Sequence, residues 1–222
     1  VCPMLPKALS NGICSLNAGV DRLAMACEMI ITPDGKVSSY EIFPTIIHVY
    51  RRLSYTIVNK ILVDKERIQW FASNYANVHD VFFIGRGIDY AICLEGSLKL
   101  KEISYIHSEA YAAGELKHGT ISLIENGTLV IGALSQSELY EKTISNMVEC
   151  KSRGAYLAGI TTYGKYSTEE HVDFTVYVPR INELFACSLM IIPLQLLAYY
   201  VSVVKGLDVD KPRNLAKSVT VE

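Results

Sequence analysis

A dense group of titratable side chains lies in the middle of the chain. Glu95, Lys99 and Glu102 follow one another at spacings of four and three residues, so a helix here places all three on one face. Apolar residues fill most of the positions around them. We therefore expect the charges to be partly buried, where pKa values shift and functional roles are common. The same spacing also allows a solvated stripe of ion pairs.

A second group follows in residues 107–119, HSEAYAAGELKHG, and ends with His118. Its glycines and alanines argue against a long helix, and we interpret it as an irregular loop at the edge of a site. Glutamate and histidine together suit general acid–base catalysis. The run His107-Ser108-Glu109 imitates the H-x-E motif of zinc deaminases, but the sequence has no P-C-x-x-C partner, so we predict no metal site.

Alternating strand and helix patterns must position these groups. The expected helices are residues 66–76, 90–105, 138–152 and 184–204, and the expected strands are residues 81–85, 128–134, 155–161 and 173–179. This alternation predicts an α/β fold, a parallel sheet with helices on both faces. Ligands of such sheets collect at the carboxyl ends of the strands, so Gly85-Arg86-Gly87 is the first turn to consider, although G-x-G alone is a weak motif.

The first part of the chain has a different pattern. Within residues 22–50, two β-rich runs flank Pro33-Asp34-Gly35-Lys36, which is a turn signal of the hairpin kind. We expect a small antiparallel β-rich fragment here, followed by a short helix.

Composition excludes several classes of function. The 222 residues are 50% hydrophobic, and 21 basic against 23 acidic residues give a net charge of −2, so nucleic acid binding is not expected. The six cysteines form no C-x-x-C pair, which predicts a reducing, cytoplasmic setting. The apolar run from Leu184 to Val204 is interrupted by Pro193 and Gln195, so we interpret it as a buried core helix, with a membrane span as the alternative.

Three stretches carry a family resemblance: FFIGRG, LEGSLKLKEISYIHSEAYAAGELKHG and PLQLLAYYVSVVKGLDVDKPRNLAKSVTVE. They resemble the C-terminal half of glucosamine-6-phosphate synthases, the glutamine:fructose-6-phosphate aminotransferases. The resemblance covers about residues 66–222, and it assigns residues 65–222 to the second sugar-isomerase (SIS) domain of those enzymes with its C-terminal tail. It implies an SIS-type, flavodoxin-like sheet and the isomerisation of a ketose phosphate to an aldose phosphate. It also implies fructose 6-phosphate or glucosamine 6-phosphate as ligand, no cofactor, and a homodimer.

The resemblance assigns roles to individual residues. Glu102 matches the carboxylate that moves a proton between C1 and C2 of the sugar, and His118 matches a histidine that assists ring opening and comes from the neighbouring subunit. Lys217 matches the tail lysine that forms a Schiff base with the open-chain ketose. Lys99 and Ala216 match substrate-binding positions. Ordinary explanations also exist: a helix ion pair for Glu102, a loop histidine for His118, and a tail charge for Lys217.

The sequence departs from the family pattern in three places. Thr120 follows Gly119 where the family has proline, no S-x-S-G-x-T phosphate loop occurs, and no glutaminase sequence is present. These departures predict an impaired isomerase. The alternative is a non-catalytic SIS module that binds a sugar phosphate.

Residues 1–64 resemble an internal fragment of the ribonuclease II/R catalytic domain, in the stretches PMLP, LSNGICSLN and VDRLAMACEM. The clustered aspartates that hold magnesium in those exoribonucleases are missing, since Asp21 and Asp34 are isolated. An exoribonuclease is therefore the least supported function. We interpret the chain as a chimera of two fragments, with the seam between Val63 and Arg67.

Overall fold

The computed structural model describes residues 6, 8–13, 15–32, 34–49, 56–164 and 167–213. Contacts between residues divide the chain into two units, Val1–Tyr55 and Thr56–Glu222. Helix α1 (Thr56–Leu62) packs against elements of the second unit, so this division falls earlier than the boundary that the sequence suggested at residue 64.

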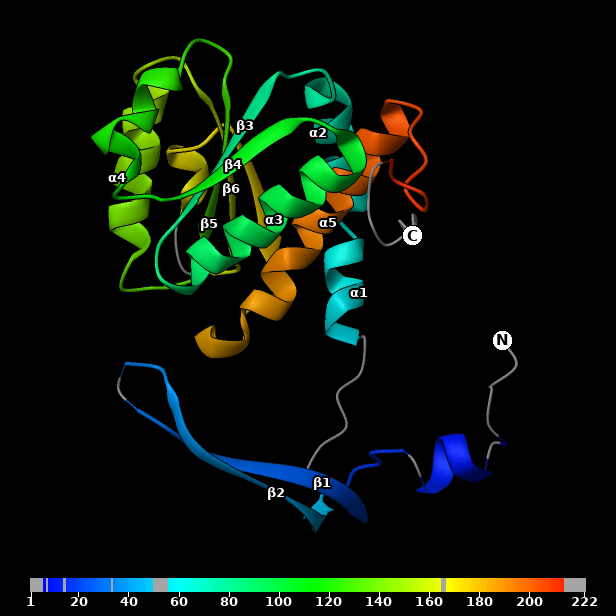
Figure 1. Cartoon of the computed structure of the whole chain (residues 1–222). Coiled ribbons are helices and arrows are strands. Elements are labelled where there is room, and N and C mark those ends of the chain that lie inside the picture. The colour runs from blue at the N-terminus through cyan, green and yellow to red at the C-terminus, as the bar shows by residue number, and fades with distance from the viewer. Residues whose placement is uncertain are drawn as a thin grey trace, which may run out of the picture. The chain divides into compact units, whose positions relative to one another are not determined.

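The first unit is an antiparallel hairpin preceded by a short π-helical turn, η1 (Ala8–Ile13). Strand β1 (Asp21–Ile31) pairs with β2 (Val37–His48) along its whole length, as the blue ribbons in Figure 1 show. Gly35, with φ of 82°, allows the tight turn between the strands. The predicted hairpin is confirmed.

One face of this hairpin is apolar and exposed. Residues directly opposite each other share a face, and the pairs Leu23 with Ile46 and Met29 with Tyr40 both lie on it. Leu23 is 87% exposed and Tyr40 is 69% exposed. A two-stranded ribbon without a covering layer is at best marginally stable in water. The first unit therefore buries little apolar surface of its own that could stabilise its folded state.

We expect limited proteolysis of the whole chain to remove the hairpin and leave the second unit. The surviving fragment should begin close to residue 56, because β1 and β2 bury few side chains while the second unit has a large core. Mass spectrometry of the digest at increasing protease concentration measures the new terminus. A full-length chain that resists the protease as well as the second unit does would show that the hairpin is stably folded.

The second unit is a parallel sheet of five strands in the order β4-β3-β5-β6-β7. The strands are β3 (Asp80–Gly85), β4 (His107–Ala112), β5 (Leu129–Leu134), β6 (Tyr156–Thr162) and β7 (Phe174–Val178). The helices are α1, α2 (Lys65–Tyr75), α3 (Ile88–Ser104), α4 (Tyr140–Lys151) and α5 (Cys187–Val204). Numbered along the chain, this strand order is 2-1-3-4-5, the flavodoxin-like arrangement. The predicted fold class is confirmed.

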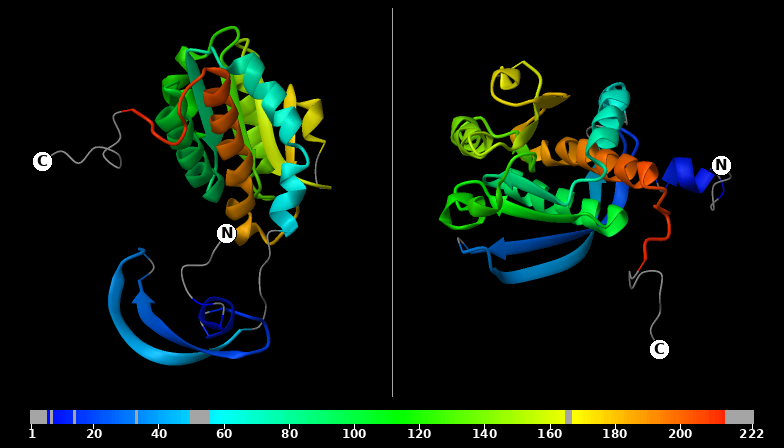
Figure 2. Two further views of the ribbon diagram at one scale, coloured as in Figure 1. Left: turned by 90° about the vertical axis from the view of Figure 1, so that its right-hand side faces the viewer. Right: turned by 90° about the horizontal axis from the view of Figure 1, so that it is seen from above.

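Alternate residues of the central strands face two separate cores. In β3, Val81 and Phe83 pack with α2, α3 and α5, whereas Phe82 and Ile84 pack with α4. Figures 1 and 2 show these helices on opposite faces of the sheet. The continuous apolar runs of the strands follow from this double coverage, which the sequence pattern predicted.

Strand β4 corrects one prediction. Residues 107–112 are a parallel edge strand paired with β3, not part of an irregular loop. An edge strand needs few apolar residues, and buried Ser108 is satisfied by a hydrogen bond with Ser97 at 3.0 Å. The irregular part is shorter and contains two 3₁₀ turns, Leu116–His118 and Thr120–Leu123.

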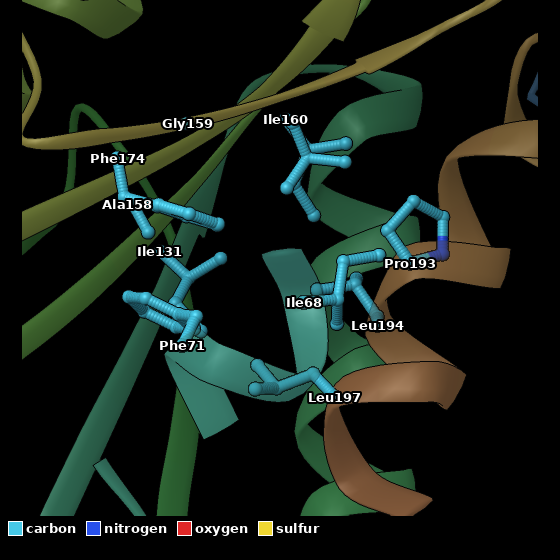
Figure 3. A pocket seen from close by; sticks show the side chains of 11 residues that line it. Ile68, Phe71, Ile131, Ala158, Gly159, Ile160, Phe174, Pro193, Leu194 and Leu197 are labelled. Carbon is cyan, nitrogen blue, oxygen red and sulfur yellow. The ribbon is translucent and has the colours of Figure 1, made fainter. Parts of the chain in front are cut away.

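Helix α5 is a core helix despite its apolar sequence. It is long and apolar enough to cross a membrane, yet residues along its length, including Met190, Leu194 and Ala198, are buried against α2, α3 and the sheet. Figure 3 shows a small cavity that remains between α2, α5 and the sheet. Ile68, Phe71 and Leu197 are among the apolar side chains that line it, so the cavity offers no group that would bind a phosphate.

Candidate functional site

The last turns of α3 hold the clearest cluster of charged groups. Lys99 Nζ lies 2.8 Å from Glu102 Oε2 and 3.5 Å from Glu95 Oε1. The side chains of Lys99 and Glu102 are 28% and 19% exposed, and that of Glu95 is 44% exposed. The prediction that the three groups share one partly buried face is therefore correct.

The electrostatics of this cluster separate the roles of its members. The hydrogen bond from Lys99 to Glu102, with further attraction from both carboxylates, raises the pKa of Lys99 above its usual value although burial opposes the change. Lys99 therefore remains a cation at neutral pH. A protonated amine cannot attack a carbonyl, but it can bind an anionic ligand and hold Glu102 in place.

His118 does not meet Glu102 within one copy of the chain. Helix α3 follows β3 and runs back along the sheet, so Glu102 lies near the amino ends of the strands. His118 follows β4 and lies, exposed, beyond its carboxyl end, where Ala113 N donates to Gly85 O at 2.8 Å. The six residues of β4 span about 20 Å. The two groups are thus at opposite ends of the sheet's strands.

The chain returns to the end of α3 after α5. Arg213 N donates a hydrogen bond to the Tyr105 hydroxyl at 2.8 Å, and the Arg213 guanidinium carbon lies 4.1 Å from the centre of the Tyr105 ring. This contact brings the start of the tail to the residue that ends α3, three positions after Glu102. Lys217 and Ala216 lie outside the described residues. No sequence pattern indicated a role for Tyr105, because its partner Arg213 is 108 positions away.

The turn after β3 lies at the switch point of the sheet, where β3 and β5 are neighbours. There the carboxylate of Asp89 accepts hydrogen bonds from Ser135 N at 2.9 Å, Ser135 Oγ at 2.5 Å and Gln136 N at 3.3 Å. Burial raises the pKa of Asp89, although these hydrogen bonds oppose the shift. Gln136 fills the space beside Gly87, where an added Cβ would lie 2.5 Å from its Oε1 atom.

Carboxylates of the chain itself therefore accept hydrogen bonds from the backbone N–H groups at the switch point. Ser137 N also donates to a carboxylate, Glu183 Oε1, at 3.3 Å. Backbone N–H groups at such a position bind phosphate in many α/β proteins, but here two carboxylates take that place. Among the described residues, no group of three or more His, Cys, Asp or Glu side chains is arranged to hold a metal ion.

Comparison with known proteins decides the family. A family model described as SIS domain matches residues 74–205, which include the sheet, α3 and α5. The chain belongs to the SIS domain family. The SIS unit, as we call residues 56–222 from here on, thus contains the Lys99–Glu102 pair, the His118 loop and the docked start of the tail.

Curated relatives match a longer part of the chain than the family model does. The glutamine–fructose-6-phosphate aminotransferase (isomerizing) of Clostridium acetobutylicum is 58% identical over 163 residues, 73% of this chain and 27% of that protein. The enzyme of the same name from Caldanaerobacter subterraneus is also 58% identical, over 165 residues. The chain therefore spans about a quarter of the length of these relatives, since the matched part is 27% of each.

Solved structures support the same fold. The C-terminal domain of glucosamine-fructose-6-phosphate aminotransferase from Francisella tularensis is 36% identical with a TM-score of 0.64, over 70% of this chain and 44% of that chain. A putative phosphosugar isomerase from Salmonella typhimurium has a TM-score of 0.58 over 71% of this chain and 47% of its own. Its 18% identity indicates a shared fold only.

Proposed function

We propose that the SIS unit is the sugar-phosphate isomerase part of a glutamine:fructose-6-phosphate aminotransferase. The reaction is the conversion of a ketose phosphate to an aldose phosphate in glucosamine 6-phosphate synthesis, in the cytoplasm. The observation that carries the proposal is the partly buried Lys99–Glu102 pair at the end of α3, beside the docked start of the tail. A desolvated carboxylate fixed by one cation is suited to accept and return a proton.

Each group has a defined step in the proposed reaction. His118 protonates the ring oxygen of fructose 6-phosphate while the ring opens. The Lys217 amine then adds to the C2 carbonyl and loses water, so that the ketose is held in its open form as an iminium. Water adds back to C2 and releases the amine before the proton transfer begins. Glu102 then removes a proton from C1 of the open ketose while the C2 oxygen gains one, which gives a 1,2-enediol. Glu102 returns its proton to C2 while the C1 hydroxyl loses one to solvent, which leaves the aldose phosphate. Lys99 and Ala216 contact the substrate, and no cofactor takes part.

The positions of Glu102 and His118 support a homodimer with shared sites. Since the two residues lie at opposite ends of the strands in one copy, a site that uses both needs His118 from a second copy. A symmetric dimer provides two such sites, each built from both subunits.

Mixed dimers test this arrangement. Co-refolding Glu102→Gln with His118→Ala chains should restore about a quarter of the wild-type isomerisation rate, because half of the dimers are mixed and each has one intact site. Either variant refolded alone is the matched control and should remain inactive. A mixture as inactive as its components would show that each site is built within one subunit.

The proposed activity should be weak in this chain. The sequence has no S-x-S-G-x-T phosphate loop, and the switch-point amides bind Asp89 and Glu183 instead of an external anion. The loss of several charge-assisted hydrogen bonds to phosphate weakens substrate binding by roughly several kcal/mol. We therefore expect a high KM for fructose 6-phosphate, and no release of ammonia from glutamine by the residues present.

The direct test is the conversion of fructose 6-phosphate to glucose 6-phosphate by the purified chain, at substrate concentrations up to tens of millimolar. Conversion that Lys217→Ala abolishes supports the proposal. Saturable binding of the sugar phosphate without conversion would favour the non-catalytic SIS module. Magnesium-dependent degradation of single-stranded RNA would instead support a ribonuclease, which the resemblance of residues 1–64 leaves as the least supported candidate.

A further inference from the structure

We propose that Tyr105 is a positioning residue that docks the C-terminal tail and so keeps Lys217 within reach of Glu102. The role of Lys217 rests on the proposed function, whereas the docking contact rests on described residues alone. Tyr105 touches neither sugar nor reacting atoms in this scheme and acts only through the tail.

Two interactions of different kinds hold Arg213 on Tyr105. The backbone N–H of Arg213 donates to the tyrosine hydroxyl at 2.8 Å, and the guanidinium carbon lies over the ring at 4.1 Å from its centre. A cation at this distance from an aromatic face is attracted by the ring electrons. Together they fix both the main chain and the side chain of Arg213, which a single surface contact would not do.

The backbone conformation of Tyr105 indicates that its side chain makes a contact that the fold needs. With φ of 59° and ψ of 18°, it is in the left-handed region, and it is the one described residue other than glycine with a positive φ. Glycine commonly takes this place after a helix because it has no Cβ, and other residues meet a steric cost there. A tyrosine at this position is explained if its side chain makes a needed contact, and the contact observed is with Arg213.

The segment between α5 and Arg213 is also held in a defined path. Gly206, with φ of 67°, ends α5 in a Schellman motif, in which Leu207 N donates to Ser202 O at 2.9 Å and Gly206 N to Val203 O at 3.0 Å. Asp208 Oδ1 then accepts hydrogen bonds from Asp210 N and Lys211 N at 3.0 and 3.1 Å. Two successive turns thus direct the chain from α5 to Tyr105.

The length of chain beyond the contact sets the reach of Lys217. Lys217 is four positions after Arg213, and an extended chain spans at most about 14 Å over four positions. Tyr105 itself is three residues after Glu102. With Arg213 docked, the reach of Lys217 is measured from the end of α3, the helix that carries Glu102, whereas in an undocked tail it would be measured from the end of α5.

The experiment compares Tyr105→Gly, Tyr105→Phe and wild-type chains in two assays. Glycine accepts the left-handed conformation, so Tyr105→Gly removes the contact without disturbing the end of α3, and phenylalanine removes only the hydroxyl. The first assay measures how fast an arginine-specific protease releases residues 214–222. The second measures the yield of the borohydride-trapped adduct of fructose 6-phosphate on Lys217 by mass spectrometry. Tyr163→Phe, at an exposed tyrosine that directly follows β6, is the control.

We expect release at Arg213 to be about fivefold or more faster in Tyr105→Gly and less affected in Tyr105→Phe. The adduct yield at a fixed time should fall in the same order, with Tyr163→Phe like wild type. Unchanged release rates in Tyr105→Gly would overturn the docking role. Faster release with an undiminished adduct would overturn the positioning role. No adduct even in wild type, with faster release in the variant, would refute the assigned role of Lys217 and leave the docking contact supported.

Discussion

Replacing Glu102 by glutamine is expected to lower the isomerisation of fructose 6-phosphate by at least about 100-fold, the usual loss when a general base is removed. Glutamine has nearly the same shape, and its amide oxygen can still accept the hydrogen bond from Lys99. It cannot accept a proton from C1. The rate of glucose 6-phosphate formation at saturating substrate measures the effect on kcat, and the free energy of unfolding should change little.

Glu95→Gln is the matched control for this variant. Glu95 is on the same helix, also pairs with Lys99 at 3.5 Å, and is more exposed than Glu102. We expect it to retain most of the activity, since an exposed ion pair contributes little. Equal losses in the two variants would mean that the charge balance around Lys99 matters, and that neither carboxylate transfers the proton.

Asp89→Ala should lower the free energy of unfolding of the SIS unit by about 2–4 kcal/mol. The carboxylate is the acceptor for two backbone N–H groups and one hydroxyl, on Ser135 and Gln136. Removing it leaves buried donors without partners, and each costs about 1–3 kcal/mol when water cannot reach it. Urea unfolding followed by circular dichroism measures the loss. Ser135→Ala, which removes only the hydroxyl donor, should cost about 1 kcal/mol.

The effect of Asp89→Ala should also depend on pH. Because burial raises the pKa of Asp89 above its usual 3.8, the folded state holds this proton more tightly than the unfolded state does. The contribution of Asp89 is therefore greatest in acid and declines as the pH rises from 3.8 through its folded pKa. The difference in free energy of unfolding between wild type and Asp89→Ala should be larger at low pH than at pH 7. A difference that grows with rising pH would show that the hydrogen bonds to Asp89, which lower its pKa, outweigh burial, which raises it.

The sequence predicted the regular part of the fold well. The runs VFFIG, TLVIGAL and AYLAGIT are apolar throughout because they lie between two layers of helices, and such runs are recognisable without structural knowledge. Strand β4 was missed because it lies at the edge of the sheet and its sequence, HSEAYA, is half polar. Its pairing with β3 depends on a partner distant in sequence, which local patterns do not reveal.

The candidate site was predicted in part, for a similar reason. Lys99 and Glu102 are three residues apart on one helix, so their spacing alone placed them together. The contact between Tyr105 and Arg213 joins segments far apart in the chain, and its helix-ending conformation has no glycine to mark it. Likewise, the backbone N–H groups at the switch point bind Asp89 because α3 packs against β5. The G-x-G turn in the sequence did not indicate this packing.

The measurement to make first is the exchange of hydrogen at C1 of fructose 6-phosphate in heavy water, followed by nuclear magnetic resonance with excess protein. This exchange reports proton transfer itself and is detectable even when complete turnover is slow. We predict deuterium at C1 with the wild-type chain and with Glu95→Gln, and none above background with Glu102→Gln. Fructose 6-phosphate that binds but never gains deuterium at C1, or that gains it as fast with Glu102→Gln, would show that this SIS unit does not perform the proposed chemistry through Glu102.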